Sequence, residues 1–271
     1  FLGRRLWHET RVALFRQSVD DRGDARRDDW RPSRVSFGHG WVRKGAQELF
    51  EEGVGLHEPV LPLLDAEDPM RVVRAGGVPS LAELRLHHGT VWRWNRAIYD
   101  PAGGGHLRIE MRALPAGPSV RDTVANAAFL LGLTLGLAPH MDELSAGLTF
   151  GHTRRNFYEA ARHGLDAELL WPEPVAPSPR GSPARELARR LMPLARDGLA
   201  RGGVEAAEAD AWLSLIEGRI ESGVTGAVWQ RRVFERALVR HPAPEALRLM
   251  LERYLAMSEA DTPVHAWPDG F

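Results

Sequence analysis

The chain has 271 residues, carries a net charge of −1 and contains no cysteine. A chain of this length forms one large domain or two smaller ones and needs no disulfide bonds to fold. The lack of cysteine excludes a disulfide scaffold, a thiol nucleophile and a cysteine-ligated metal site. The near-zero charge provides no basic field for nucleic acid or an anionic membrane, so we expect neither as a partner.

The longest apolar stretch, residues 124–138, is shorter than the roughly 20 residues that a transmembrane helix needs. We therefore expect no transmembrane helix. No secretory signal pattern is recognisable, and we expect a cytoplasmic location.

The first third of the chain predicts separate helices joined by polar and proline-containing loops. Apolar residues on one face predict a helix over residues 2–19, and mixed charges predict a solvated loop over 20–31. Helices are also expected over 43–53 and 80–86, with prolines interrupting the stretch between them.

Residues 90–114 carry the pattern of an antiparallel hairpin. Residues 90–99 are rich in β-branched and aromatic side chains, 100–105 form a glycine-rich turn, and 106–114 alternate strictly. The alternation predicts a polar face with Arg108, Glu110 and Arg112. It predicts a core face with Leu107, Ile109, Met111 and Ala113.

Matching polar with polar residues across the hairpin predicts its register. If Tyr99 pairs with His106, Asn95 lies opposite Glu110 and Arg93 lies opposite Arg112. Only Arg96, which would then face Ile109, fits this register poorly.

The remainder of the chain predicts helices. Ser119 to Asp122 resemble a helix start, which explains Asp122 as a capping residue. The helix that follows presents an apolar stripe: Val120, Val124, Ala127, Ala128, Leu131 and Leu135. Further helices are expected over residues 142–147, 153–163, 184–200, 205–221, 226–239 and 243–257.

The prolines of residues 172–183 predict a stiff linker. We therefore expect a first region over 1–171, which contains the hairpin, and a helical C-terminal region over 184–271.

The Arg108, Glu110 and Arg112 face has two interpretations. A carboxylate beside guanidinium groups stays ionised and can hold Mg²⁺, while the arginines can grip phosphate or carboxylate, as phosphoryl transfer requires. The alternative is a solvent-facing ladder of charges without chemistry.

Two motifs carry a resemblance to a known family. They are His-Gly-Thr-Val-Trp-Arg-Trp-Asn-Arg at 88–96 and Gly-His-Leu-Arg-Ile-Glu-Met-Arg-Ala-Leu-Pro at 105–115. Together they closely resemble the second glutamate–cysteine ligase family, which includes bacterial carboxylate–amine ligases related in fold to glutamine synthetase. Residues 156–167, 225–230 and 264–268 are also similar to that family.

The resemblance implies an α+β, helix-rich fold in which the hairpin belongs to a glutamine-synthetase-like sheet. It implies a ligase that uses ATP and Mg²⁺ to activate glutamate as an acyl phosphate, which an amine such as cysteine then attacks. Such an activity would belong to glutathione biosynthesis. By residue, it implies catalytic roles for Arg112 and Arg93, cofactor contacts for Arg108, Asn95 and Arg162, and Mg²⁺ ligation by Glu110.

The chain departs from the family because no early acidic strand motif precedes Arg93. We therefore expect it to be the C-terminal half of such an enzyme, with an incomplete sheet and with the missing N-terminal half or a second copy as partner. The alternative is a non-catalytic helical binding module that keeps the scaffold.

Two histidine features are weaker candidates. His87 and His88 are adjacent, so they point apart in an extended strand and are not expected to share a metal ion. His39 lies between two glycines and is read either as part of an ordinary turn or as a substrate-contacting loop residue.

Overall fold

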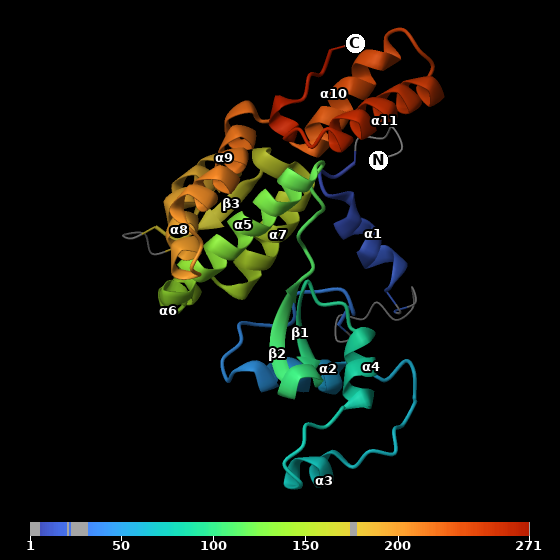
Figure 1. The fold of residues 1–271 in the computed structure, drawn as a ribbon, viewed down its shortest axis with the longest axis vertical. Coiled ribbons are helices and arrows are strands. Elements are labelled where there is room, and N and C mark those ends of the chain that lie inside the picture. Colours follow the sequence, from blue (N-terminus) through green and yellow to red (C-terminus); the bar gives the residue numbers. More distant parts are fainter. Residues whose placement is uncertain (1–5, 21, 23–31, 174–177, 271) are drawn as a thin grey trace. The chain divides into compact units, whose positions relative to one another are not determined.

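The computed structural model describes residues 6–20, 22, 32–173 and 178–270, which group into two compact units (Figure 1). We call residues 11–113 the hairpin unit, and residues 114–271 together with 1–10 the helical unit. The chain divides after residues 10 and 113, and the expected linker 172–183 lies within the helical unit, where residues 180–183 form a strand. Most of the predicted loop over 20–31 lies outside the described residues.

The hairpin unit combines short helices with one two-stranded antiparallel sheet. Its elements are α1 (Thr10–Ser18), α2 (Ala46–Leu56), α3 (Pro69–Arg74), α4 (Ala82–Gly89), β1 (Asn95–Asp100) and β2 (His106–Met111). Helices α2 and α4 were expected from the sequence and α3 was not. Helix α3 begins after Asp68, whose carboxylate accepts from the backbone N–H groups of Met70 and Arg71.

The helical unit contains the long helices and a second small sheet. Its helices are α5 (Val120–Leu137), α6 (Met141–Gly147), α7 (Phe150–His163), α8 (Ala184–Arg201), α9 (Ala206–Ser222), α10 (Gly226–Leu238) and α11 (Ala243–Glu259). Strands β3 (Glu168–Trp171) and β4 (Arg180–Pro183) pair in antiparallel fashion and were not predicted. The described chain is therefore helix-rich with two small antiparallel sheets, which agrees with the expected α+β class.

Side-chain caps mark where several helices begin, including α7, which begins at Phe150 rather than at the expected residue 153. Ser119, Thr149 and Thr225 each accept a hydrogen bond from the backbone N–H three residues ahead. Helix α9 ends at Gly223, whose φ of 68° is the left-handed conformation that glycine adopts without strain. These start and stop signals are local, so they are readable from the sequence.

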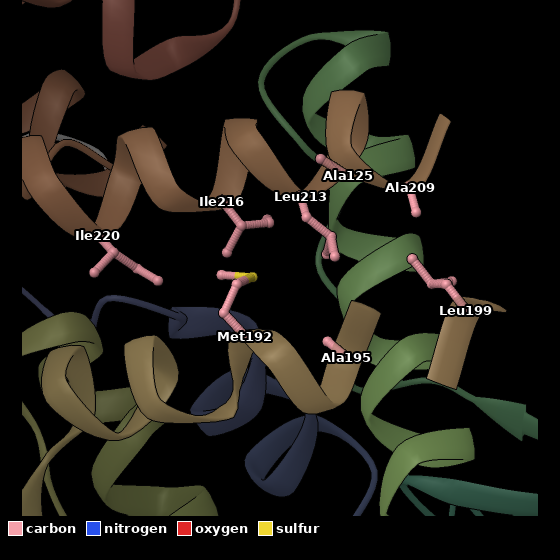
Figure 2. Packing of buried hydrophobic residues seen from close by; sticks show 8 residues of the cluster. All are labelled: Ala125, Met192, Ala195, Leu199, Ala209, Leu213, Ile216 and Ile220. Atoms are coloured by element: carbon pink, nitrogen blue, oxygen red, sulfur yellow. The ribbon is translucent and has the colours of Figure 1, made fainter. Parts of the chain in front are cut away.

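The centre of the helical unit is an apolar cluster formed by helices α5, α8 and α9 (Figure 2). Its buried members are Ala125, Met192, Ala195, Leu199, Ala209, Leu213, Ile216 and Ile220. Helices α5 and α8 cross so closely that a Cβ atom added at Gly198 would lie 1.9 Å from the carbonyl oxygen of Gly132. Glycine is therefore required at this crossing.

The buried face of α5 is not the predicted apolar stripe. Val120 is 70% exposed and Leu131 is 49% exposed, whereas Ala125, Gly132 and Gly136 are buried. Of the predicted stripe, Ala128 packs against the apolar cluster but the large residues do not, because α8 approaches α5 at the small residues Gly132 and Gly136. A large side chain on the buried face would hold the two helix backbones apart.

Asp122 has a larger structural role than helix capping. Its side chain is fully buried and accepts from Arg219 Nη2 at 2.7 Å, from Ser119 Oγ at 3.0 Å and from the backbone N–H of Val264 at 3.0 Å. One carboxylate thus connects the start of α5 to α9 and to the turn that follows α11. The capping interpretation of Asp122 was incomplete, since these partners are remote in sequence.

One helical stretch in the described part of the chain, Val120–Gly147, is long and apolar enough to cross a membrane by length and composition. This finding differs from the expectation that no such segment exists. Of the apolar window in this stretch, 22% is buried, and the α5 part packs against α8 and α9.

Candidate functional site

Strands β1 and β2 pair antiparallel as predicted, but their register differs by one residue from the expected one. Asp100 rather than Tyr99 lies opposite His106, and Arg96 consequently lies opposite Glu110. Asn95 lies opposite Met111 instead of Glu110. The observed register replaces the mismatch of Arg96 with Ile109 by an ion pair, which explains why it is preferred.

The one-residue shift decides which side chains share a face. Arg96, Ile98 and Asp100 of β1 lie on the same face as Arg108 and Glu110 of β2.

The opposite face was predicted to be core, yet its β2 residues are largely exposed to solvent. Leu107 is 55% exposed and Ile109 is 48% exposed, while Ala97 of β1 is buried. The polar-face residues of β2 are exposed to a similar extent, Arg108 at 50% and Glu110 at 44%, so neither face of β2 is buried.

A cavity of about 330 Å³ lies against this polar face. Helices α2 and α4 lie beside the hairpin (Figure 1) and complete its walls. Helix α4 contributes Leu84, Arg85 and His88, and α2 contributes Phe50. The volume is at the lower end of the range found for small-molecule sites. All the lining residues belong to the hairpin unit.

Glu110 lines this cavity and lies between two arginines, of which Arg96 also lines the cavity. Its Oε2 accepts from Arg96 Nε at 2.9 Å and from Arg96 Nη2 at 2.8 Å, and lies 3.6 Å from Arg112 Nε. Burial, with Arg96 nearby, lowers the pKa of the Arg112 guanidinium, although Glu110 acts in the opposite direction. The predicted Arg–Glu–Arg arrangement therefore exists, but Arg96 takes the place expected for Arg108.

Arg108 belongs to a separate ion pair at the turn end of the hairpin. Its Nη1 donates to Asp100 Oδ2 at 2.9 Å and lies 2.8 Å from His106 Nε2. The Ala102 backbone N–H and then Arg108 lower the pKa of the Asp100 carboxyl. The two hairpin carboxylates that line the cavity are thus each paired with a guanidinium.

His88 forms part of the buried wall of the cavity. Its ring packs on Phe50 with a centroid separation of 4.8 Å, and burial lowers its pKa. His87 instead contacts the Gly53 carbonyl oxygen through Nε2 at 3.0 Å. The rings of the two histidines are 6.1 Å apart. Both residues lie at the end of α4 rather than in a strand, where they were expected.

The remaining predicted residues lie away from Glu110. The buried guanidinium of Arg93 pairs with Glu52 at 2.5 Å and also contacts Ser36. Asn95 is exposed on the opposite face of the hairpin. Arg162 belongs to the helical unit, where it pairs with Glu159 and stacks over Trp7.

His39 has a defined partner. Its Nδ1 lies 3.2 Å from the Oε1 atom of Glu52, the same carboxylate that pairs with Arg93. The residue is about half exposed, so the contact is compatible with both interpretations of its loop.

Sequence reasoning missed Arg85 and undervalued Arg96. The signal for Arg96 was its poor fit in the predicted register, which a shift by one residue removes. No pattern in the sequence pointed to Arg85, because its role depends on the packing of α4 beside the hairpin.

The donor groups around Glu110 do not fit a metal ion held by the protein alone. Glu110 shares Oε2 with two guanidinium groups, and Asp100 is bound by Arg108. No group of three or more histidine or acidic side chains that could hold a metal occurs within the described ranges. Anions, rather than free cations, suit this arrangement.

Comparison of the chain with protein-family models, with curated proteins and with solved structures gives no match.

Proposed function

We propose that this chain is part of an ATP-dependent carboxylate–amine ligase, similar to glutamate–cysteine ligase, with its reaction site at the hairpin cavity. The observation that carries the proposal is Glu110 held between Arg96 and Arg112 beside that cavity. The motifs that resemble the ligase family contain these three residues.

The proposed reaction has two steps. A carboxylate oxygen of glutamate attacks the γ-phosphorus of ATP, and ADP leaves. The amine nitrogen then attacks the acyl-phosphate carbon, phosphate leaves, and the nitrogen loses a proton to form the amide. The first step brings two anionic groups together and the second releases an anionic phosphate, and guanidinium groups stabilise the negative charge in both.

Arg96 and Arg112 would supply this positive charge, and Glu110 would hold their planar groups in position. Magnesium would enter with ATP as part of the substrate, since the protein donors do not form a metal site of their own.

The proposal extends to the fold and to partners. The two-stranded hairpin would be one part of a glutamine-synthetase-like sheet, completed by an N-terminal half or by a second copy of the chain. Exposed Leu107 and Ile109 support this view, because an apolar strand face gains stability when it is covered.

The experiment is a measurement of ATP-dependent ADP release with glutamate and a panel of amines that includes cysteine. It is run on this chain and on the full-length product of its gene. Glu110→Gln should reduce the rate by about 10²–10³-fold, the effect of removing one preorganised charged group from a reaction site. Arg112→Lys should also be severe, because an ammonium group cannot reproduce a planar, bidentate contact.

Glu51→Gln is the matched control, since Glu51 is exposed on α2 and does not line the cavity. Circular dichroism of each variant separates loss of chemistry from loss of fold. Wild-type turnover by a folded Glu110→Gln variant would refute the assignment.

The alternative is a non-catalytic binding module, and one observation favours it. Glu110 and Asp100 are already neutralised by arginine, as expected of a structural charge ladder. Absence of ADP release from the full-length product with any amine, together with a thermal shift by Mg-ATP, would support this alternative.

A further inference from the structure

Arg85 differs from the other two arginines that line the hairpin cavity. Arg96 is bound to Glu110 at 2.8 Å, and Arg108 is bound to Asp100 at 2.9 Å. The Arg85 side chain has no hydrogen bond or ion pair with any residue that the structure describes. It is therefore the one guanidinium at the cavity whose charge the described protein leaves unneutralised.

Helix α4 places Arg85 at the cavity together with His88 and Gly89. These positions are three and four residues apart, so they share one face of the helix. Arg85 and the polar face of the hairpin line the same cavity, so a molecule bound in the cavity lies near Arg85. The residue itself is exposed to solvent, which leaves its guanidinium accessible.

The charge balance of the cavity favours an anion. Three guanidinium groups line it, but only two carboxylates, those of Asp100 and Glu110. Burial lowers the pKa of His88, which favours the neutral ring over a further cation. The lining side chains therefore carry a net charge of one positive unit.

Apolar side chains also line the cavity. They are Phe50 of α2, Leu84 of α4 and Ile98 of β1, the last on the same strand face as Arg96. Apolar walls exclude water and strengthen the attraction between a guanidinium and a bound anion. A compact molecule with one anionic end and a hydrocarbon portion satisfies both parts of the cavity.

We propose that Arg85 binds the anionic group, carboxylate or phosphate, of a small molecule in this cavity and determines its selectivity for negatively charged ligands. The inference rests on the proposed function in one respect, because both assign ligand binding to the same cavity. Arg85 would be a binding residue, whereas Arg96 and Arg108 are occupied by the hairpin carboxylates.

The test is titration calorimetry with three probes. Glutarate and inorganic phosphate are the anions, and pentane-1,5-diol is the uncharged analogue of glutarate. Wild-type protein should bind at least one anion and should not bind the diol measurably. If glutarate binds more tightly, the natural ligand carries a carboxylate; if phosphate binds more tightly, it carries a phosphate.

Arg85→Gln should weaken binding of that anion about tenfold, the effect of losing one charge-assisted hydrogen bond. Arg74→Gln is the matched control, because the substitution removes the same charge from the same unit. Arg74 is exposed on α3 and does not line the cavity. Arg85→Lys keeps the charge and should retain most of the affinity for phosphate. Glutamine has nearly the helix propensity of arginine, so the variant should fold, and circular dichroism verifies this.

Three results would overturn the inference: no anion binding by wild-type protein, equal binding of diol and glutarate, or equal anion binding by wild type and Arg85→Gln. The ADP-release assay separates this inference from the proposed function. Anion binding that depends on Arg85 without any ADP release refutes the ligase and keeps the inference. ADP release combined with anion binding that Arg85→Gln does not change supports the ligase and refutes the inference.

Discussion

The helical unit and the hairpin unit are stabilised in different ways. The helical unit buries a continuous apolar cluster between α5, α8 and α9 and a second one around Trp229 and Trp267. The hairpin unit buries few large side chains, Val12, Val35, Val91 and Trp94 among them, and leaves others such as Leu64 exposed. Its paired strands present charged groups to a cavity.

This difference suggests that the helical unit contributes most of the stability and that the hairpin unit provides the binding site. Close-packed apolar clusters contribute most to folding, whereas a polar face beside an open cavity contributes less and can bind a ligand. Substitutions in the helical unit should therefore affect stability most. Substitutions on the cavity face should affect binding or turnover most.

The largest effect on stability is expected for Asp122→Asn. The substitution removes the buried charge of Asp122 that compensates Arg219, whose side chain is 12% exposed, and loss of one partner of such a pair costs about 3–5 kcal/mol in free energy of unfolding. Asp210→Asn is the control, because Asp210 pairs with Arg196 on the surface and its loss should cost below about 1 kcal/mol. Urea denaturation followed by circular dichroism measures both. Similar values for the two variants would contradict the structural role of Asp122.

Three glycine-to-alanine substitutions compare packing in the two units. Urea denaturation of each variant measures the change in its free energy of unfolding. Gly198→Ala would bring Cβ within 1.9 Å of a carbonyl oxygen, and we expect a loss of about 2–3 kcal/mol. Gly53→Ala meets only the His88 ring, at 2.8 Å, and should cost about 1 kcal/mol. Gly151→Ala has space and should stabilise the protein by about 0.5 kcal/mol. A milder effect at Gly198 than at Gly53 would show that the α5–α8 crossing can adjust.

The smallest expected effect is a pH dependence confined to the hairpin unit. Burial lowers the pKa of His88 below its ordinary value of 6.5. A hydrogen bond with the Phe50 backbone opposes this shift, and the nearby charges of His87, Arg93 and Arg96 add to it. The unfolded chain therefore binds more protons than the folded one just below pH 6.5. Stability from His88 is complete above this pH and decreases as the pH falls below it.

Amide hydrogen exchange of α4, corrected for intrinsic rates, measures this loss on either side of pH 6.5. His88→Phe keeps a ring on Phe50 and should remove the pH dependence. His163→Gln should leave it unchanged, because the His163 side chain is 56% exposed at the end of α7 in the other unit. Persistence of the effect in His88→Phe would assign it to another group.

The positions of most helices were predictable because their signals are local. Ser119, Thr149 and Thr225 mark helix starts, and Gly223 marks an end, whatever lies nearby in space. Strands β3 and β4 were missed because a proline-rich stretch includes β4 and resembles a linker. Their pairing depends on contacts between segments that are separate in the sequence.

The orientation of elements was harder to predict than their presence. The buried face of α5 depends on Gly132 and Gly136, which periodicity in large apolar residues does not reveal. The hairpin was recognised, yet its register moved by one residue because the pairing of Arg96 with Glu110 outweighed apolar matching. The same shift separates Asn95 from Glu110, so the predicted set of site residues was only partly brought together.

The close approach of Gly198 to Gly132 also has an attractive component. The direction in which other residues carry Cβ is occupied at Gly198 by a hydrogen atom, which points at the Gly132 carbonyl oxygen. Such a Cα–H···O contact between helices contributes about 0.5–1 kcal/mol. The two backbones are therefore joined by a weak hydrogen bond that involves no side chain. Exchanges among the surrounding apolar residues leave this contact in place as long as both glycines remain.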